Sequence, residues 1–135
     1  NCRLNDPVFE RGLRDFMAVC NVVKTFRNMR ILQISTRPYE FWSTMCNEGE
    51  LLEKFNIQLT PIPMPELTDE MKKAKAEGTE VAKVVEYCRQ NMEICVKDNE
   101  LENVAALKVA MGNLIKKYGC QAAAIQCWNQ LQSEI

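Results

Sequence analysis

Three short apolar segments, separated by long stretches of helical periodicity, constrain the fold of this chain more than any other feature. They are residues 29–35, 57–62 and 122–127, and they carry the β-branched or small apolar side chains of strands. Antiparallel strands can be joined by a tight turn, whereas parallel strands need a crossover of about a dozen residues or more. Each connection here is long enough for a crossover, so the pattern predicts a parallel sheet of three strands.

The first long helix is predicted to begin at Pro7, after a capping Asp6, and to run through Phe26. Its apolar residues recur at steps of three and four, so we expect one face of the helix to be buried. A second helix is expected over residues 40–55. The apolar positions of the first helix are Phe9, Leu13, Phe16, Met17, Cys20, Val23 and Phe26.

Further helices are predicted between the second and third strands. Residues 67–78 are polar and helix-prone, and apolar residues from Val81 to Cys95 repeat at helical spacing. In the last helix, Asn99 and Glu102 resemble a capping box, and Gly119 is the expected C-terminal cap.

The alternation of elements predicts an α/β fold, a three-layer Rossmann-like open parallel sheet with flanking helices. The third strand is alanine-rich, and we expect it to be buried on both faces, as strands of parallel sheets are. No repeat or flexible linker divides residues 1–135, so we expect a single α/β domain.

Composition limits the classes of partner. Apolar residues make up 47% of the chain, charged residues 26%, and the formal net charge is −1. We therefore expect no attraction to nucleic acid or to an anionic membrane. No apolar run approaches the roughly 20 residues of a membrane span, and the first residues do not resemble a signal peptide. Seven cysteines suit a reducing, cytoplasmic location, and their spacing favours buried structural thiols over zinc ligands.

The chain lacks much of the usual catalytic chemistry. It contains no histidine, which removes the commonest general base and metal ligand. Its five glycines form no phosphate-binding motif of the known types. Glu48 and Glu50 are two residues apart on a predicted helix, so they point to different sides and make a poor acid/base pair. We assign no catalytic residue and no metal ligand to this chain.

Candidate binding residues follow the strands, because ligands of open parallel sheets collect at the carboxyl ends of the strands. Arg37 follows the first strand and carries a forked donor group that suits an anionic or polyhydroxylated ligand. Gln126, Trp128 and Asn129 follow the third strand and combine amides with an aromatic platform suited to a sugar. Alternatively, Arg37 pairs with a nearby carboxylate such as Glu40 or Glu48, and Trp128 closes the core.

Three segments together resemble the central domain of the L-fucose isomerase-like proteins, in the fucose and arabinose isomerase group. They are residues 35–41 with an Arg-Pro loop, residues 47–55, and residues 124–128 at the end of a strand. The resemblance is a pattern spread over nearly the whole chain, and none of the segments is diagnostic alone.

The resemblance implies a metal-dependent aldose–ketose isomerase of carbohydrate metabolism, which moves a proton between neighbouring carbons of an open-chain sugar with the help of Mn²⁺ or another divalent metal. It also implies that the metal ligands, including a histidine, come from other domains of the parent chain, and that the parent forms a homo-oligomer. We therefore expect this domain to contribute one wall of a sugar pocket and no cofactor site, and to be inactive alone. A non-catalytic sugar-binding domain and an oligomer-assembly domain remain the alternatives.

Overall fold

The computed structural model of the chain describes residues 3–134. Contacts between residues divide the chain into two compact units, one of residues 1–29 and 47–58 and the other of residues 30–46 and 59–135. Each unit is described by itself.

The first unit contains two helices, α1 (Pro7–Phe26) and α2 (Glu48–Phe55). The carboxylate of Asp6 accepts a hydrogen bond from the backbone N–H of Val8 at 2.9 Å, which confirms the predicted N-cap of α1. In the same way, the Asn47 side chain caps α2. The short polar side chains at these positions satisfy backbone donors that a helix leaves unpaired at its start.

The C-terminal ends of α1 and α2 are held together. The rings of Phe26 and Phe55 meet edge to face, with centroids 5.3 Å apart. The backbone N–H of Asn28 donates to the carbonyl of Phe55 at 3.1 Å, and the Asn56 amide donates to Asn28 Oδ1 at 2.6 Å. Asn28 and Asn56 both have positive φ, at 90° and 53°, a region that asparagine enters more readily than most residues. These contacts fix the two helix ends relative to each other.

The sheet has three strands, β1 (Arg30–Ile34), β2 (Gln58–Ile62) and β3 (Ala122–Ile125), in the order β2-β1-β3. The predicted small open parallel sheet is therefore confirmed, with Ile34 of β1 opposite Ile125 of β3. Pro61 lies within β2, where its missing N–H is tolerated because β2 is an edge strand.

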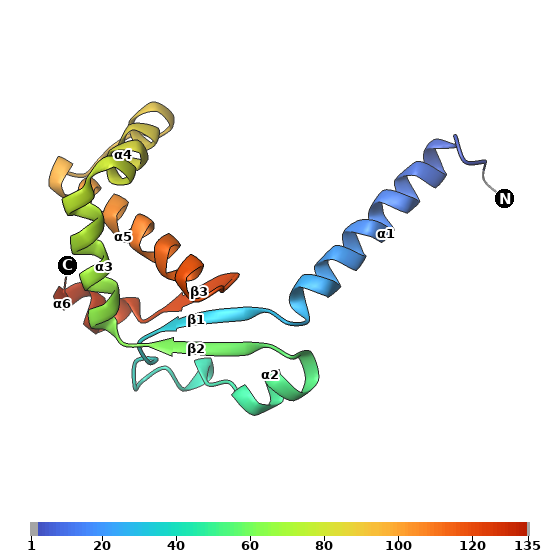
Figure 1. Cartoon of the computed structure of the whole chain (residues 1–135), viewed down its shortest axis with the longest axis horizontal. Helices are drawn as coiled ribbons and strands as arrows, with labels where there is room; N and C mark the ends of the chain where they lie inside the picture. The colour runs from blue at the N-terminus through green and yellow to red at the C-terminus, as the bar shows by residue number, and fades with distance from the viewer. Residues whose placement is uncertain (1–2, 135) are drawn as a thin grey trace. The chain divides into compact units, whose positions relative to one another are not determined.

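Helices of the second unit lie on one side of its sheet (Figure 1). They are α3 (Met64–Glu77), α4 (Thr79–Asn91) and α5 (Asp98–Lys117). The unit also contains a 3-10 turn, η1 (Trp42–Thr44), a π-type turn, η2 (Cys127–Leu131), and a short helix, α6 (Gln132–Glu134). The core between the sheet, α3 and α5 is formed by Leu32, Ile34, Ile62, Met64, Leu67, Met71, Ala110, Leu114 and Cys120.

Within residues 3–134, no helix is both long enough and apolar enough to cross a membrane.

Two predictions about the first unit and its neighbouring loop are wrong. Although α1 forms as expected, none of its residues is buried, so the predicted buried face is absent. The helix expected over residues 40–55 is also shorter than predicted. It begins only at Glu48, because the Asn47 cap starts the helix there, and the preceding segment contains just the η1 turn.

Two predictions in the second unit need smaller corrections. The alanine-rich strand is not buried on both faces, because β3 is an edge strand and its residues are half-buried or exposed. The last helix begins at Asp98, and it is Glu100, not Glu102, whose carboxylate accepts from the backbone N–H of the N-cap residue, Lys97, at 3.1 Å. The expected end of the helix is confirmed, with Gly119 at φ 61° just beyond it.

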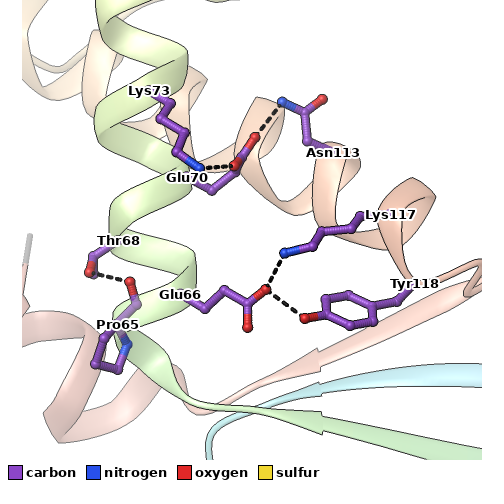
Figure 2. A network of polar contacts seen from close by, with 8 residues as sticks. All are labelled: Pro65, Glu66, Thr68, Glu70, Lys73, Asn113, Lys117 and Tyr118. Carbon is purple, nitrogen blue, oxygen red and sulfur yellow. Dashed lines mark hydrogen bonds and ion pairs between the residues drawn. The ribbon is translucent and has the colours of Figure 1, made fainter.

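A polar network joins the start of α3 to the end of α5 (Figure 2). One carboxylate oxygen of Glu66 accepts from the Lys117 ammonium at 2.8 Å and from the Tyr118 hydroxyl at 2.7 Å. One turn further along α3, Glu70 accepts from the Asn113 amide at 3.0 Å. The hydrogen bonds from Lys117 and then Tyr118 lower the pKa of Glu66 below its usual value.

We expect this network to make the stability of the domain sensitive to acid. Because the folded-state pKa of Glu66 is depressed, its contribution is present above the unfolded pKa, near 4.5, and is lost as pH falls through the folded value. Glu66→Gln removes this titration. As pH falls from neutral to about 3, the free energy of unfolding of the variant should therefore fall less steeply than that of the unaltered chain. Urea unfolding at several pH values measures the difference.

Tyr118→Phe keeps the ring and removes one of the two donors. We expect it to change the folding equilibrium constant at pH 7 less than about tenfold, as for the loss of one hydrogen bond.

The matched control for Glu66→Gln is Glu70→Gln, which leaves the Glu66 contacts in place. If Glu70→Gln flattened the acid response as much as Glu66→Gln does, the assignment to Glu66 would be wrong.

Candidate functional site

The carboxyl ends of β1 and β3 lie next to each other in the second unit. The backbone N–H of Gln126 donates to the carbonyl of Ile34 at 3.1 Å, continuing the β1–β3 ladder. On the other side of β1, the N–H of Ser35 donates to the carbonyl of Ile62 at the end of β2 at 2.8 Å. All three strands therefore end together, and the loops that follow them leave from one edge of the sheet.

Ser35 links the loop after β1 to the segment after β3. Its hydroxyl lies 2.8 Å from Gln126 Oε1 and 2.7 Å from Gln130 Oε1. A hydroxyl has one hydrogen to donate, so only one of these carboxamides can accept it, and the other must present its NH₂ group to Ser35 Oγ.

The backbone at this edge is strained at two non-glycine residues. Ser35 has φ 65° and Asn129 has φ 68°, both in the left-handed region, which costs most L-residues about 1–2 kcal/mol and asparagine less. Asn129 lies inside η2 with non-helical dihedral angles and interrupts it. Strain of this kind is commonest at binding and catalytic sites, because surrounding contacts must hold the residue in place.

Arg37 lies in the loop after β1 and is half-buried. Its Nη1 donates to the carbonyls of Pro38 and Tyr39, each at 3.1 Å, and its guanidinium lies 5.0 Å from the centre of the Trp42 ring. These contacts are with its own loop, not with Glu40, so the predicted alternative of an Arg37–Glu40 ion pair is not observed. A guanidinium held in this way keeps its remaining N–H groups for a ligand.

Trp128 contacts Phe41 edge to face, with ring centroids 5.3 Å apart. This contact brings the loop after β1 against the turn after β3. Trp128 is nevertheless 53% exposed, so it does not close the core as the alternative interpretation supposed. An aromatic ring fixed along one edge and open to solvent elsewhere offers a platform for an apolar ligand face.

The four predicted site residues thus come from two adjoining segments of one sheet edge. Gln126 is tied to β1 through Ser35, and Trp128 is tied through Phe41 to the loop that holds Arg37. Asn129 is exposed and lies next to Trp128 in η2. Sequence reasoning did not single out Ser35, Phe41, Trp42 or Gln130. Ser35 and Gln130 lie within segments that it placed at this edge, but nothing in the sequence indicates the positive φ of Ser35.

The cysteines are less buried than expected. Cys120 is buried and Cys88 is partly buried, whereas the thiols of Cys20, Cys46, Cys95 and Cys127 are exposed. The prediction of buried structural thiols is therefore wrong for these four, and Cys2 lies outside the described residues. In residues 3–134, no three cysteine or carboxylate side chains cluster as a metal-ligand set. No metal-dependent step is assigned to the described residues.

The arrangement can bind and orient a small polar molecule. It offers hydrogen-bond donors and acceptors from amides, a hydroxyl and a guanidinium, beside two tryptophans, Trp42 and Trp128. Comparison with models of known protein families and with curated protein sequences finds no match for this chain.

Proposed function

We propose that this chain is a domain of a metal-dependent aldose–ketose isomerase of the L-fucose and L-arabinose type, and that its sheet edge forms one wall of the sugar pocket. The observation that carries the proposal is the convergence of Arg37, Gln126 and Trp128 at one edge of the sheet. Its second support is the sequence resemblance carried by residues 35–41, 47–55 and 124–128.

An open-chain sugar has a row of hydroxyl groups and a row of C–H bonds. The exposed ring of Trp128 suits the C–H face, and the carboxamides of Gln126 and Asn129 suit hydroxyl groups, because an amide both donates and accepts. Arg37 adds donors to carbonyl and hydroxyl oxygens. In this proposal the four residues hold and orient the sugar, and none of them transfers a proton.

The remaining parts of the proposal concern the parent protein. Other domains of the parent chain supply the metal ligands and the catalytic groups, with Mn²⁺ or another divalent metal polarising the sugar oxygens. The complete domain adopts the three-layer Rossmann-like arrangement, of which the parallel sheet and its helices are the part described. The parent is cytoplasmic, where the exposed thiols of Cys46 and Cys127 would stay reduced.

A non-catalytic sugar-binding domain is the second candidate. It is favoured by the same edge geometry, because nothing in that geometry requires a reaction. The two functions differ in one respect that can be measured: a pocket wall of an isomerase should bind the open-chain form, whereas a sugar receptor should bind the ring form that dominates in solution.

Tryptophan fluorescence provides the test, because both tryptophans of the chain, Trp42 and Trp128, lie at this edge. We expect L-fucitol and L-arabinitol, which are permanently open-chain polyols, to change the emission in a saturable way, and the corresponding methyl pyranosides to have a weaker effect. Stronger binding of the pyranosides would favour the receptor, and no saturable change with either ligand would contradict both functions. Glycerol at equal viscosity is the control.

A further inference from the structure

Exposed apolar side chains gather on α1. In the described structure none of the residues of α1 is buried, and Phe16 near its middle is 66% exposed. The sugar pocket proposed above makes no use of this helix. A helix that exposes so many apolar side chains is typical of an interaction surface. Its exposed large apolar residues are Val8, Phe9, Leu13, Phe16, Met17, Val19, Val22, Val23 and Phe26.

The spacing of apolar residues on α1 is compatible with helix pairing. Five of them follow one another at steps of four, three, four and three, which is the a/d repeat of a coiled coil. We call these residues the apolar stripe. They are Phe9, Leu13, Phe16, Cys20 and Val23.

The charges beside the apolar stripe indicate which helix would pair with it. One flank carries Glu10, Met17 and Lys24, each seven residues from the next, and the other carries Gly12, Val19 and Phe26. Among residues 3–134, neither Glu10 nor Lys24 makes an ion pair. From this pattern we propose that α1 pairs with α1 of a second copy of this chain, and that the two helices run antiparallel.

The direction follows from charge complementarity. In an antiparallel pair each flank faces the same flank of the partner in reverse order, so Glu10 faces the other Lys24 twice, and Met17 faces Met17 at the centre. In a parallel pair the flank that carries Glu10 and Lys24 faces the other flank of the partner helix. The two charges then lie against Gly12, Val19 and Phe26 of the partner. Antiparallel pairing also places opposite ends of the helix dipoles side by side.

The size of the interface sets the expected affinity. A helix of 20 residues is about 30 Å long, and contact over its width of about 12 Å buries roughly 700 Å² on the two helices together. This is below the roughly 1,000 Å² of a stable specific interface, so we expect a weak, reversible dimer with a dissociation constant of tens to hundreds of micromolar.

Sedimentation equilibrium of the whole chain over about 1–500 μM, a range chosen to bracket micromolar affinity, tests the proposal. Glu10→Lys creates two like-charge pairs and should raise the dimer dissociation constant at least fivefold, and Lys24→Glu should do the same. An equimolar mixture of these two variants should regain dimers, because each variant then faces its opposite charge. The double variant should also dimerise. Phe16→Glu, in the apolar stripe, should abolish association.

The control is Glu93→Lys, which makes the same charge change at an exposed position outside α1 and should leave the dimer intact. A chain that stays monomeric over the whole range would overturn the proposal. A dimer that responds equally to Glu93→Lys and Glu10→Lys, or a mixture of charge variants that fails to dimerise, would overturn the antiparallel pairing of α1.

Discussion

Replacing Leu67 by alanine is expected to lower the free energy of unfolding by about 2–5 kcal/mol, the range measured for fully buried leucines. Leu67 is 0% exposed and lies in the core between α3, α5 and the sheet, with Leu32, Ile34 and Leu114. Removing its branched end takes apolar surface out of the core and leaves a cavity that rigid neighbours fill only in part. Urea unfolding followed by circular dichroism measures the change.

The matched control for Leu67 is Val104→Ala on α5, where the side chain is largely exposed. We expect it to change stability by less than about 0.5 kcal/mol. Similar losses of unfolding free energy for Leu67→Ala and Val104→Ala would contradict the placement of Leu67 in the core of the second unit. A large loss for Leu67 with little change for Val104 is the expected result.

The second large effect concerns the sheet edge. Trp128→Ala should weaken the binding of L-fucitol about tenfold, because the indole covers about 50 Å² of the ligand's C–H face and roughly 25 cal/mol per Å² gives about 1.3 kcal/mol. The emission of Trp42, the remaining tryptophan, reports binding in this variant.

The control for Trp128 is Tyr87→Ala, which removes an exposed aromatic residue of α4 and should leave L-fucitol binding unchanged. Equal losses for both variants would mean that binding depends on general surface properties and not on the sheet edge. Because Trp128 also touches Phe41, the urea midpoint of Trp128→Ala should be measured, and binding compared only where the variant is folded.

The sequence was sufficient to predict the strands because each is a short apolar run bounded by turn-forming residues. Residues 29–35 contain β1, and Gly119 ends α5 as expected because glycine adopts its positive φ without strain. The predicted start of α2 at residue 40 is wrong, because the Asn47 side chain accepts from the Glu50 N–H and caps the helix there.

Burial was harder to predict than secondary structure. The spacing on α1 shows that the helix has an apolar face, but periodicity does not say whether the same chain or another one covers that face. In β3, the small side chains predict burial on both faces, whereas the strand lies at the edge of the sheet. Position within a sheet depends on pairing between distant segments, which a local pattern does not contain.

The candidate site could be located from the sequence but not built from it. Strand-end reasoning placed Arg37, Gln126, Trp128 and Asn129 near one another, since parallel strands end at one edge. The contacts that join them depend on Ser35 at positive φ and on Phe41, whose roles follow from three-dimensional packing. The sequence indicates neither the positive φ of Ser35 nor the contact of Phe41 with Trp128.

The most direct test of the sugar-pocket proposal is a titration of the ¹⁵N-labelled chain with L-fucitol, followed by two-dimensional NMR. The indole N–H signals of Trp42 and Trp128 and the backbone amides of Ser35 and Gln126 should shift together with one dissociation constant, while those of α4 stay in place. If these signals remain unchanged up to millimolar ligand, or if the shifts cluster on α4 instead, the sheet edge is not a sugar site and the proposed function is wrong.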